Sequence, residues 1–288
     1  MSPSVRALVA ASLVAGLSIP AAGLAQADQP VARTYREFDG KPLQLFVFAT
    51  PPRAPGAPPS AAVLLLHGGG WTAGNAEWTF AQARRFAHEG FVAIAVDYRL
   101  ADSVITPIEQ LADVCTAFKW TRSHAAELGV NPDRLAAYGV SAGGHLAAAA
   151  ATIGCNNFFG TYGLGGPDAL VLLSPAVDAA YDAHFVRLLR ARADPADLSP
   201  MQRMRTRMPP TIIVQGDKDS LTPLGGAQRF CDRIRKDRGR CDLLVYKGLG
   251  HVLTRNLANQ ESDFDPDPVA REDGLTKQVR FLRELWRR

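Results

Sequence analysis

The apolar positions of this chain fall into two kinds of segment. Six continuous apolar runs are short and are typical of strands buried on both faces of a sheet. Between them lie segments with helical patterning, over about 78–88, 107–128 and 269–286. Strands that alternate with helices predict βαβ units and a parallel sheet. The six runs are AAVLLL (61–66), FVAIAV (91–96), RLAAY (134–138), ALVLL (169–173), TIIVQG (211–216) and DLLVY (242–246).

Two further segments complete the predicted architecture. Residues 34–50 alternate between apolar and polar positions around Asp39-Gly40, a hairpin signal, and predict an antiparallel edge on the sheet. The interval 176–210 predicts two short helices and is the only candidate for a cap. We therefore expect one α/β domain over 28–288, with helices on both faces of a mostly parallel sheet and at most a short cap.

The first 27 residues have the form of a secretory signal peptide. A short n-region with one positive charge, Arg6, precedes an apolar stretch over 7–24, and Ala25-Gln26-Ala27 is a small-x-small cleavage site. A membrane anchor is the alternative, but Pro20 breaks the apolar stretch and the AQA site follows it. We expect residues 1–27 to be cleaved, and the protein to be exported to the periplasm or outside the cell without stable membrane insertion.

Composition and charge narrow the class of partner. Hydrophobic residues make up 47% of the 288 residues and charged residues 21%, an ordinary globular balance. The formal charge is +4, and the densest basic stretch, Arg229–Arg240, also contains Asp232 and Asp237. This mixture predicts a solvated helix face rather than a nucleic-acid site. Oligomeric state is left open.

Export would permit the four cysteines to form disulfides. Cys231 is expected on a helix and Cys241 at the start of the next strand, so a bridge between them would join two neighbouring elements. Cys115 and Cys155 are the remaining pair; their spacing gives a bridge little support, and two buried thiols are the favoured interpretation. No pair has the CxxC spacing of zinc or thioredoxin-type sites.

A candidate nucleophile follows the third apolar run. Gly139-Val140-Ser141-Ala142-Gly143 matches G-x-S-x-G, in which a tight turn between strand and helix presents the serine hydroxyl. The motif alone is weak evidence, since a glycine-rich helix entry has the same composition. Here a buried strand precedes it and an alanine-rich helix follows it, which is the context the motif requires. In a parallel sheet this position lies at the edge where ligands bind.

A serine nucleophile needs a general base. For this turn type the chain order is serine, acid, histidine, which leaves His145, His184 and His251. His145 is only four residues beyond Ser141 and is interpreted as a packing or polar-network residue. His184 lies in the cap candidate, before the last two strands. His251 follows the final strand and is therefore assigned as the base.

Ester cleavage also needs N–H donors for the developing oxyanion. His67-Gly68-Gly69-Gly70 follows the first apolar run with three glycines, and Ala142 follows the nucleophile. We expect the amides of Gly69, Gly70 and Ala142 to form the oxyanion hole. Trp71 and His67 are assigned to the substrate pocket, with ordinary core packing as the alternative for Trp71.

These motifs together resemble the α/β-hydrolase superfamily, and more narrowly the bacterial esterases with an HGGG oxyanion loop. HGGGW, DYRL, NPDRLAAYGVSAGGHLAA, PPTIIVQGDKDSLTP and GLGH carry the resemblance, which runs from about Thr34 to the last helix. Within those esterases the chain is similar to the secreted acetyl-esterase and feruloyl-esterase-like group, which lacks a large lid. The resemblance implies a Ser-His-Asp triad, an acyl-enzyme mechanism, no metal and no organic cofactor.

The family pattern also bears on the choice of acid. Members commonly read H-G-x-x-D-x-x-V-P at the segment that here reads QGDKDSLTP, which points to Asp219 rather than Asp217. Gln215 and Thr222 depart from the pattern. Asp219 could instead be a helix N-cap, but Thr222-Pro223 already forms a good cap and first-turn proline. Asp219 is assigned as the acid, and Asp217 is kept in reserve.

The leading prediction is an exported serine carboxylesterase acting on short-chain, acetyl or aryl esters. Alternatives on the same fold are a polysaccharide-directed acetyl-xylan or feruloyl esterase, a lipase and a serine peptidase. A catalytically inactive binding protein would have lost a triad member, yet all three are present. The substrate is expected to be a small or polysaccharide-linked ester, and the acyl and alcohol groups are left open.

Overall fold

A single eight-stranded sheet forms the centre of the computed structural model, which describes residues 29–50, 56–155 and 165–287. The expected leader, 1–27, lies outside the described residues. The strands follow the order β1-β2-β4-β3-β5-β6-β7-β8 across the sheet. Their bounds are β1 (Val31–Phe38), β2 (Lys41–Phe48), β3 (Ser60–Leu66), β4 (Val92–Val96), β5 (Val130–Val140), β6 (Ala169–Leu173), β7 (Thr211–Gly216) and β8 (Cys241–Tyr246).

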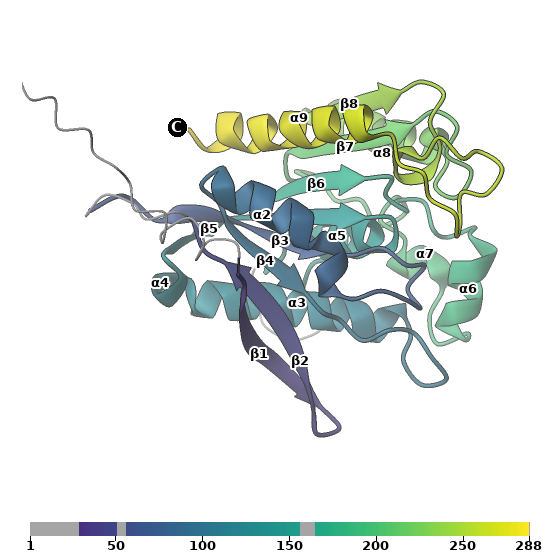
Figure 1. Ribbon diagram of the computed structural model, residues 1–288. Coiled ribbons are helices and arrows are strands. Elements are labelled where there is room, and N and C mark those ends of the chain that lie inside the picture. The colour runs from purple at the N-terminus through teal and green to yellow at the C-terminus, as the bar shows by residue number, and fades with distance from the viewer. Residues whose placement is uncertain (1–28, 51–55, 156–164, 288) are drawn as a thin grey trace, which may run out of the picture.

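The predicted mixture of parallel and antiparallel strands is confirmed. Strands β3 to β8 run parallel to one another, whereas β1 pairs with β2, and β2 with β4, antiparallel. The hairpin turns at Asp39 and Gly40, whose φ angles of 49° and 70° suit the turn that matches strand twist. Because the parallel strands share a direction, the loops that follow them gather at one edge, on the right in Figure 1.

Helices cover both faces of the sheet, as predicted. Helices α2 (Phe80–His88) and α9 (Pro268–Trp286) pack on one face, and α3 (Pro107–Ser123), α5 (Ala142–Thr152) and α8 (Leu224–Lys236) on the other (Figure 1). Within the described residues, no helix is both long and apolar enough to cross a membrane. The short helices are η1 (Ala76–Thr79), α4 (Ala125–Leu128), α6 (Ala183–Leu189), α7 (Pro195–Leu198) and η3 (His251–Leu253).

Helix α5 is buried along its whole length. Its run of five alanines and two glycines gives it side chains small enough to pack closely between the sheet and α3. This close packing fixes the start of the helix, and therefore Ser141 before it, against β5. The expected pair of short cap helices is α6 and α7, which lie over the carboxyl edge of the strands (Figure 1).

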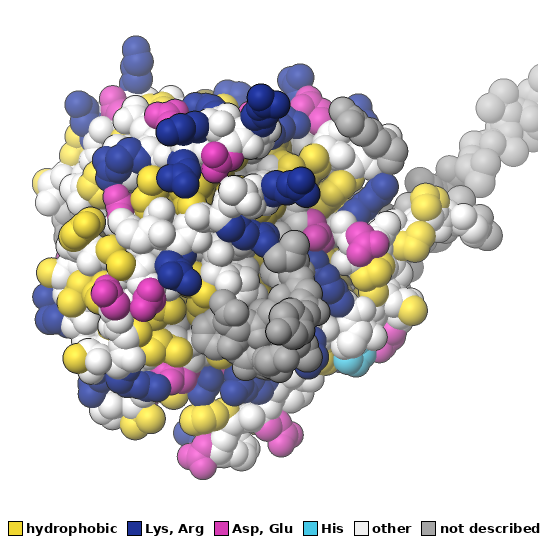
Figure 2. All heavy atoms as spheres, turned by 180° about the vertical axis from the view of Figure 1, so that it is seen from behind, with side chains coloured by type: hydrophobic (Ala, Val, Ile, Leu, Met, Phe, Trp, Pro, Cys, Tyr) yellow, Lys and Arg dark blue, Asp and Glu magenta, His cyan; other side chains and the backbone are white. Residues whose placement is uncertain are grey.

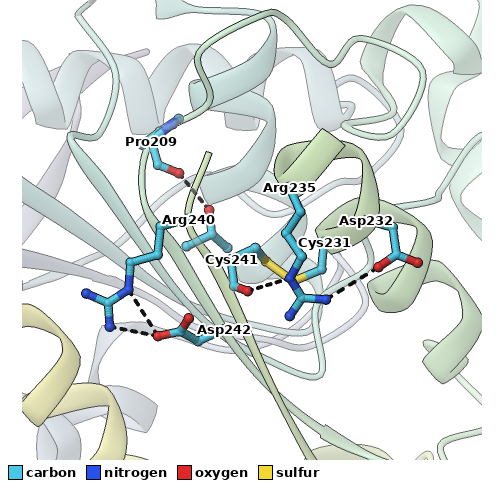
Figure 3. The surroundings of a disulfide bond; sticks show 8 residues. Pro209, Cys231, Asp232, Arg235, Arg240, Cys241 and Asp242 are labelled. Atoms are coloured by element: carbon cyan, nitrogen blue, oxygen red, sulfur yellow. Dashed lines mark hydrogen bonds and ion pairs between the residues drawn. A yellow bond between two sulfur atoms is a disulfide. The ribbon is translucent and has the colours of Figure 1, made fainter. Parts of the chain in front are cut away.

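Both cysteine pairs form disulfides. Cys231 on α8 is joined to Cys241 at the start of β8, with their Cα atoms 5.3 Å apart (Figure 3). The favoured interpretation of Cys115 and Cys155 as free thiols is wrong, because the structure joins them with a Cα–Cα distance of 5.1 Å. Their bridge connects α3 to the segment just after α5, a contact between distant parts of the chain that sequence spacing does not reveal.

Several arginines of the basic stretch 229–240, on α8 and just after it, are paired with acidic groups. Arg235 bonds to Asp232 and to the carbonyl of Cys241, and Arg240 bonds to Asp242, around the disulfide in Figure 3. Arg229 is paired with Asp178. On the face seen in Figure 2, basic side chains are interspersed with acidic and apolar ones. These pairs fit the expectation of a solvated helix face.

Candidate active site

Ser141 stands on a sharp turn between β5 and α5. Its φ of 52° and ψ of −115° lie in a region that costs a non-glycine residue about 1–3 kcal/mol. Gly139 and Gly143 make the turn possible, because a Cβ on either would lie within 2.5 Å of a backbone oxygen. The strain is held by the packing of α5, and it lifts the serine side chain away from the strand.

The structure brings Ser141, His251 and Asp219 together in one hydrogen-bonded chain. His251 Nε2 lies 2.9 Å from Ser141 Oγ. On the other side of the ring, Nδ1 donates to Asp219, 2.9 Å from Oδ2 and 3.1 Å from Oδ1. The imidazole is 3% exposed and the carboxylate side chain is fully buried. The three residues come from the loops after β5, β7 and β8, in the order that the sequence predicts.

Asp219 accepts hydrogen bonds on both oxygens. Oδ1 accepts from the backbone amides of Leu221 and Thr222, at 3.0 and 2.8 Å. Oδ2 accepts from Gln215 Nε2 at 2.8 Å and from the Thr222 hydroxyl at 2.9 Å. Burial acts to raise the pKa of Asp219, but the bonds from His251 and Thr222 outweigh it, and the pKa lies below the usual carboxyl range. The group is therefore held as a carboxylate.

The role expected for Thr222 is wrong. Helix α8 begins at Leu224, its N-cap is Pro223, and no side chain caps it. The hydroxyl of Thr222 instead contacts Asp219 Oδ2, His251 Nδ1 at 3.2 Å and the carbonyl of Ser174 at 3.0 Å. The departure from the family pattern at this position thus places a hydroxyl between the acid and the base.

Asp217 and Asp219 occupy different environments. Asp217 is half-buried, and its Oδ1 accepts from the amide of Gly248 at 2.7 Å, which ties the loop after β7 to the loop after β8. Among the described residues it has no contact with His251. The structure therefore brings Asp219, and not Asp217, to the histidine.

The HGGG loop passes directly beside the serine. A Cβ built on Gly68 would lie 3.3 Å from Ser141 Cβ. Gly69 and Gly70 have φ angles of 113° and 55°, and the carbonyl of Gly69 accepts from the amides of Thr72 and Ala73 in a tight turn. The amides of Gly69, Gly70 and Ala142 have no acceptor among the residues that the structure describes. The three amides proposed to meet the oxyanion are thus not engaged by another described group.

His67 and Trp71 lie deeper than the pocket-lining role expected for them. His67 is 1% exposed and its ring stacks on Tyr98 at 4.2 Å, while the Tyr98 hydroxyl donates to the His67 carbonyl. Trp71 is 4% exposed and donates from Nε1 to His145 Nδ1 at 3.2 Å. His145 Nε2 donates to the carbonyl of Leu198 near the cap, so His145 belongs to a polar network, as predicted. His67 and Trp71 are therefore buried residues that pack beneath the surface and support the HGGG loop.

Burial also acts on the two histidines of this support. It lowers the pKa of His67 to about 4, although the hydrogen bond to the Gly68 carbonyl opposes the change. It likewise lowers the pKa of His145 to about 4, against the bond to Leu198. Both rings are therefore neutral at neutral pH.

Gln260 is a site residue that the sequence did not indicate. Its Oε1 accepts from the amides of His251 at 2.8 Å and Ser220 at 3.1 Å, and its Nε2 donates to the carbonyl of Lys218 at 2.9 Å. One buried side chain thus joins the loop of the acid to the loop of the histidine. It lies in an irregular segment without a motif, so no sequence signal pointed to it.

Comparison with known proteins gives the family. The prolyl oligopeptidase family model matches residues 108–265, more than half of the chain, and the BD-FAE model matches residues 50–163. Thermogutta terrifontis esterase 2 with butyrate bound superposes with a TM-score of 0.78 at 27% identity, covering 91% of this chain and 96% of that one. Its structure phosphorylated by paraoxon has a TM-score of 0.77 at 28% identity, covering 90% and 95%.

Curated relatives by sequence are also esterases. Esterase LipC of Mycobacterium tuberculosis is 29% identical over 67% of this chain and 53% of its own length. Ethyl acetate hydrolase of Pseudomonas putida is 33% identical over 54% of this chain and 48% of its own length. The chain therefore spans about half the length of these relatives. It belongs to the prolyl oligopeptidase family of α/β-hydrolases, and its HGGG loop and esterase relatives place it among the HGGG-type esterases of that fold.

Proposed function

We propose that this chain is an exported serine carboxylesterase for short-chain esters, with Ser141, His251 and Asp219 as its catalytic triad. The hydrogen-bonded chain from Ser141 Oγ through the imidazole to the buried carboxylate is the observation that carries the proposal. A serine beside a base oriented by an acid is the arrangement that nucleophilic ester cleavage requires.

In the proposed mechanism Ser141 Oγ attacks the ester carbonyl while His251 Nε2 takes the hydroxyl proton. The carbonyl oxygen becomes an oxyanion, and the free amides of Gly69, Gly70 and Ala142 donate to it. His251 then gives the proton to the leaving alcohol, which leaves an acyl group on Ser141. Water, activated by the same imidazole, releases the acid and restores the serine.

A preference for short acyl groups agrees with the ligands and substrates of similar esterases and with the small size of the cap. Thermogutta terrifontis esterase 2 has been solved with propionate and with butyrate bound, and a Pseudomonas putida relative is an ethyl acetate hydrolase. In this chain the segment above the site holds only α6 and α7, of seven and four residues. Phe264, 46% exposed, lies with its ring centre 6.4 Å from that of His251, at the edge of the site. An aromatic edge suits aryl esters.

Export is proposed on separate grounds. Residues 1–27 have the form of a signal peptide, and two disulfides persist most readily in an oxidising compartment. Mass spectrometry of the protein recovered from the periplasm or medium tests this proposal directly. A chain that begins at Asp28 is expected; an uncleaved chain retained in the cytoplasm would contradict it.

The esterase proposal is tested with p-nitrophenyl acetate, butyrate and decanoate. We expect acetate and butyrate to be preferred to decanoate, and Ser141→Ala to lose the activity. Paraoxon should inactivate the wild type and modify it once, on Ser141, and should leave Ser141→Ala unmodified. Equal hydrolysis by wild type and Ser141→Ala would refute the mechanism. Acetylated xylan and methyl ferulate, assayed in the same series, separate a small-ester enzyme from a polysaccharide-directed one.

Peptide hydrolysis is a second candidate, since the matching family model is that of the prolyl oligopeptidases. The same triad can cleave an amide, which has a poorer leaving group. Proline p-nitroanilides distinguish the two: the esterase proposal expects turnover at least about 100-fold slower than that of the matched esters, which corresponds to a barrier about 2.7 kcal/mol higher for the amide.

A further inference from the structure

Both departures from the family pattern beside the acid contact Asp219. Gln215 stands where the pattern has histidine and Thr222 where it has valine. Each reaches Oδ2, the oxygen nearer to His251 Nδ1. We propose that Gln215 and Thr222 are positioning residues: they hold Oδ2 on the histidine and share its negative charge, which tunes how strongly Asp219 attracts the protonated imidazole. This inference rests on the proposed function.

The orientation of the Gln215 amide follows from its acceptors. Nε2 lies 2.8 Å from Asp219 Oδ2 and 2.9 Å from the carbonyl of Thr222, and both of these atoms can only accept. The NH₂ end must therefore face them. The carbonyl end, Oε1, is buried without a partner among the described residues. A buried amide with one end unsatisfied is a poor packing residue, so its contribution lies in the donated bonds.

Thr222 connects the acid to the base and to a third strand. Its hydroxyl lies within 3.2 Å of Asp219 Oδ2, of His251 Nδ1 and of the Ser174 carbonyl after β6. The Ser174 hydroxyl in turn accepts from the amide of Val252, next to His251. A valine has the same shape but can form none of these bonds.

No other charged group competes for this role. Among the described residues, the only ionisable side chain bonded to Asp219 is that of His251. Nearby charges are engaged elsewhere: Asp217 accepts from Gly248, and Arg255 is paired with Asp265. Charged groups on the surrounding segments include Asp178 and Asp182 after β6, Asp217 and Lys218 before the acid, Arg229 on α8, Arg255 and Asp265 after η3, and Arg271 on α9.

The physical effect has a definite sign for Gln215. A donor on Oδ2 disperses the carboxylate charge, so the carboxylate stabilises an imidazolium less. Removing the donor strengthens that attraction, and the enzyme then needs a higher pH to reach the free base. One hydrogen bond of ordinary strength corresponds to a shift of about 0.5–1 pH unit.

Gln215→Met tests this effect, because methionine keeps the length of glutamine and removes its donors. The acid limb of the kcat/KM–pH profile should move upward by about 0.5–1 unit, and the downfield Nδ1 proton signal of His251 should titrate with it. Gln278→Met is the matched control: Gln278 is also buried and donates to a carbonyl, that of Leu172, but outside the triad. An unmoved acid limb in Gln215→Met, or an equal shift in the control, overturns the proposal.

Thr222→Val tests the positioning independently. We expect kcat to fall about 10-fold with KM unchanged, and Thr222→Ser to recover most of it. Thr211→Val, which removes a buried hydroxyl bond to Pro209 at the other end of β7, should leave kcat as it is. Because both residues act through Asp219 Oδ2, the double variant of Gln215→Met and Thr222→Val should lose less kcat/KM than the product of the factors lost by the two single variants. An unchanged kcat in Thr222→Val overturns the role of Thr222.

Failure of this inference is distinguishable from failure of the esterase proposal. If Ser141→Ala retains wild-type hydrolysis, the proposed function is wrong and the pH profile of Gln215→Met carries no meaning for the triad. If Ser141→Ala is inactive while Gln215→Met keeps the wild-type profile, the esterase stands and the positioning role alone is refuted.

Discussion

The loop after β3 lies directly beside Ser141, and the loop after β7 acts on it through His251, yet the two loops are held in different ways. In the HGGG loop the backbone itself takes unusual conformations, with φ of 113° at Gly69, 55° at Gly70 and 64° at Trp71. Between Asp217 and Pro223, a segment described throughout, no φ is positive. The acid loop is held instead by side-chain hydrogen bonds from Gln215, Thr222 and Gln260.

This difference predicts opposite sensitivities. The HGGG loop should be damaged by adding a side chain where the backbone has no room for one. The acid loop should be damaged by removing polar atoms from side chains already there. It also explains why the first loop is conspicuous in a sequence, as a run of glycines, and the second is not.

The largest effect is expected at the acid itself. Asp219→Asn should lower kcat by about 10³–10⁴, because the amide no longer holds the histidine in the required tautomer. Asp217→Asn is the matched control two residues away and should stay within a few-fold of wild type, since its contact is with the Gly248 amide. Steady-state kinetics with p-nitrophenyl acetate checks both. The reverse result would exchange the two assignments.

Gly69→Ala should lose about 10²-fold or more in kcat/KM. A Cβ at this position would lie 2.1 Å from the Ala73 carbonyl oxygen, so the loop must move and its amides leave the oxyanion. Gly40→Ala is the control: φ is also positive, at 70°, but nothing lies within 4 Å of the added carbon. It should cost about 1 kcal/mol of stability and no activity. Equal activity of the two variants would contradict the loop argument.

As the pH is lowered, protonation of His67 and His145, which support the HGGG loop, should destabilise the fold before Asp219 becomes protonated. The pKa of His67 and of His145 is lowered to about 4, so between about pH 6.5 and 4 the unfolded chain binds protons that the native state does not. Stability must fall as pH falls through this window, by up to about 3 kcal/mol per ring. The contribution of Asp219, whose pKa is lowered, is lost only below the usual carboxyl range.

Urea unfolding measured from pH 7 to 4 tests this order. His67→Asn should reduce the pH dependence of the unfolding free energy in that window by about half, because one of the two buried rings is removed. An unchanged slope would show that the buried imidazole is not the cause.

The smallest effect is expected at the residue that joins the two loops of the acid and the base. Gln260→Ala should lower kcat about 10-fold with little change in KM, since His251 and Ser220 lose a shared acceptor. Gln278→Ala, a buried glutamine bonded to Leu172, should leave kcat within two-fold, an order-of-magnitude expectation for a residue away from the chemistry. Stability measured alongside separates a folding defect from a positioning defect.

Much of the fold followed from local pattern. The apolar runs predicted the buried strands, Asp39-Gly40 predicted the hairpin, and the interval 176–210 predicted α6 and α7. The pattern failed where a contact joins distant segments. Thr222 was expected to cap a helix and contacts the acid instead, because the tertiary fold brings oxygens of Asp219 and Ser174 within 3.0 Å of its hydroxyl. Cys115 and Cys155 lie 40 residues apart, and only the packing of α3 against α5 brings them together.

The sequence by itself determined which residue types reach the carboxyl edge of the sheet and in what order, because strand period, turn glycines and the Gly-Val-Ser-Ala-Gly turn are local properties of the chain. The tertiary structure alone decided what surrounds each of them. Asp219 and His251 are 32 residues apart, and Gln215, Thr222 and Gln260 reach them from three segments. Hydrogen bonds depend on distances of tenths of an ångström between such segments, and no pattern along one chain segment encodes those distances.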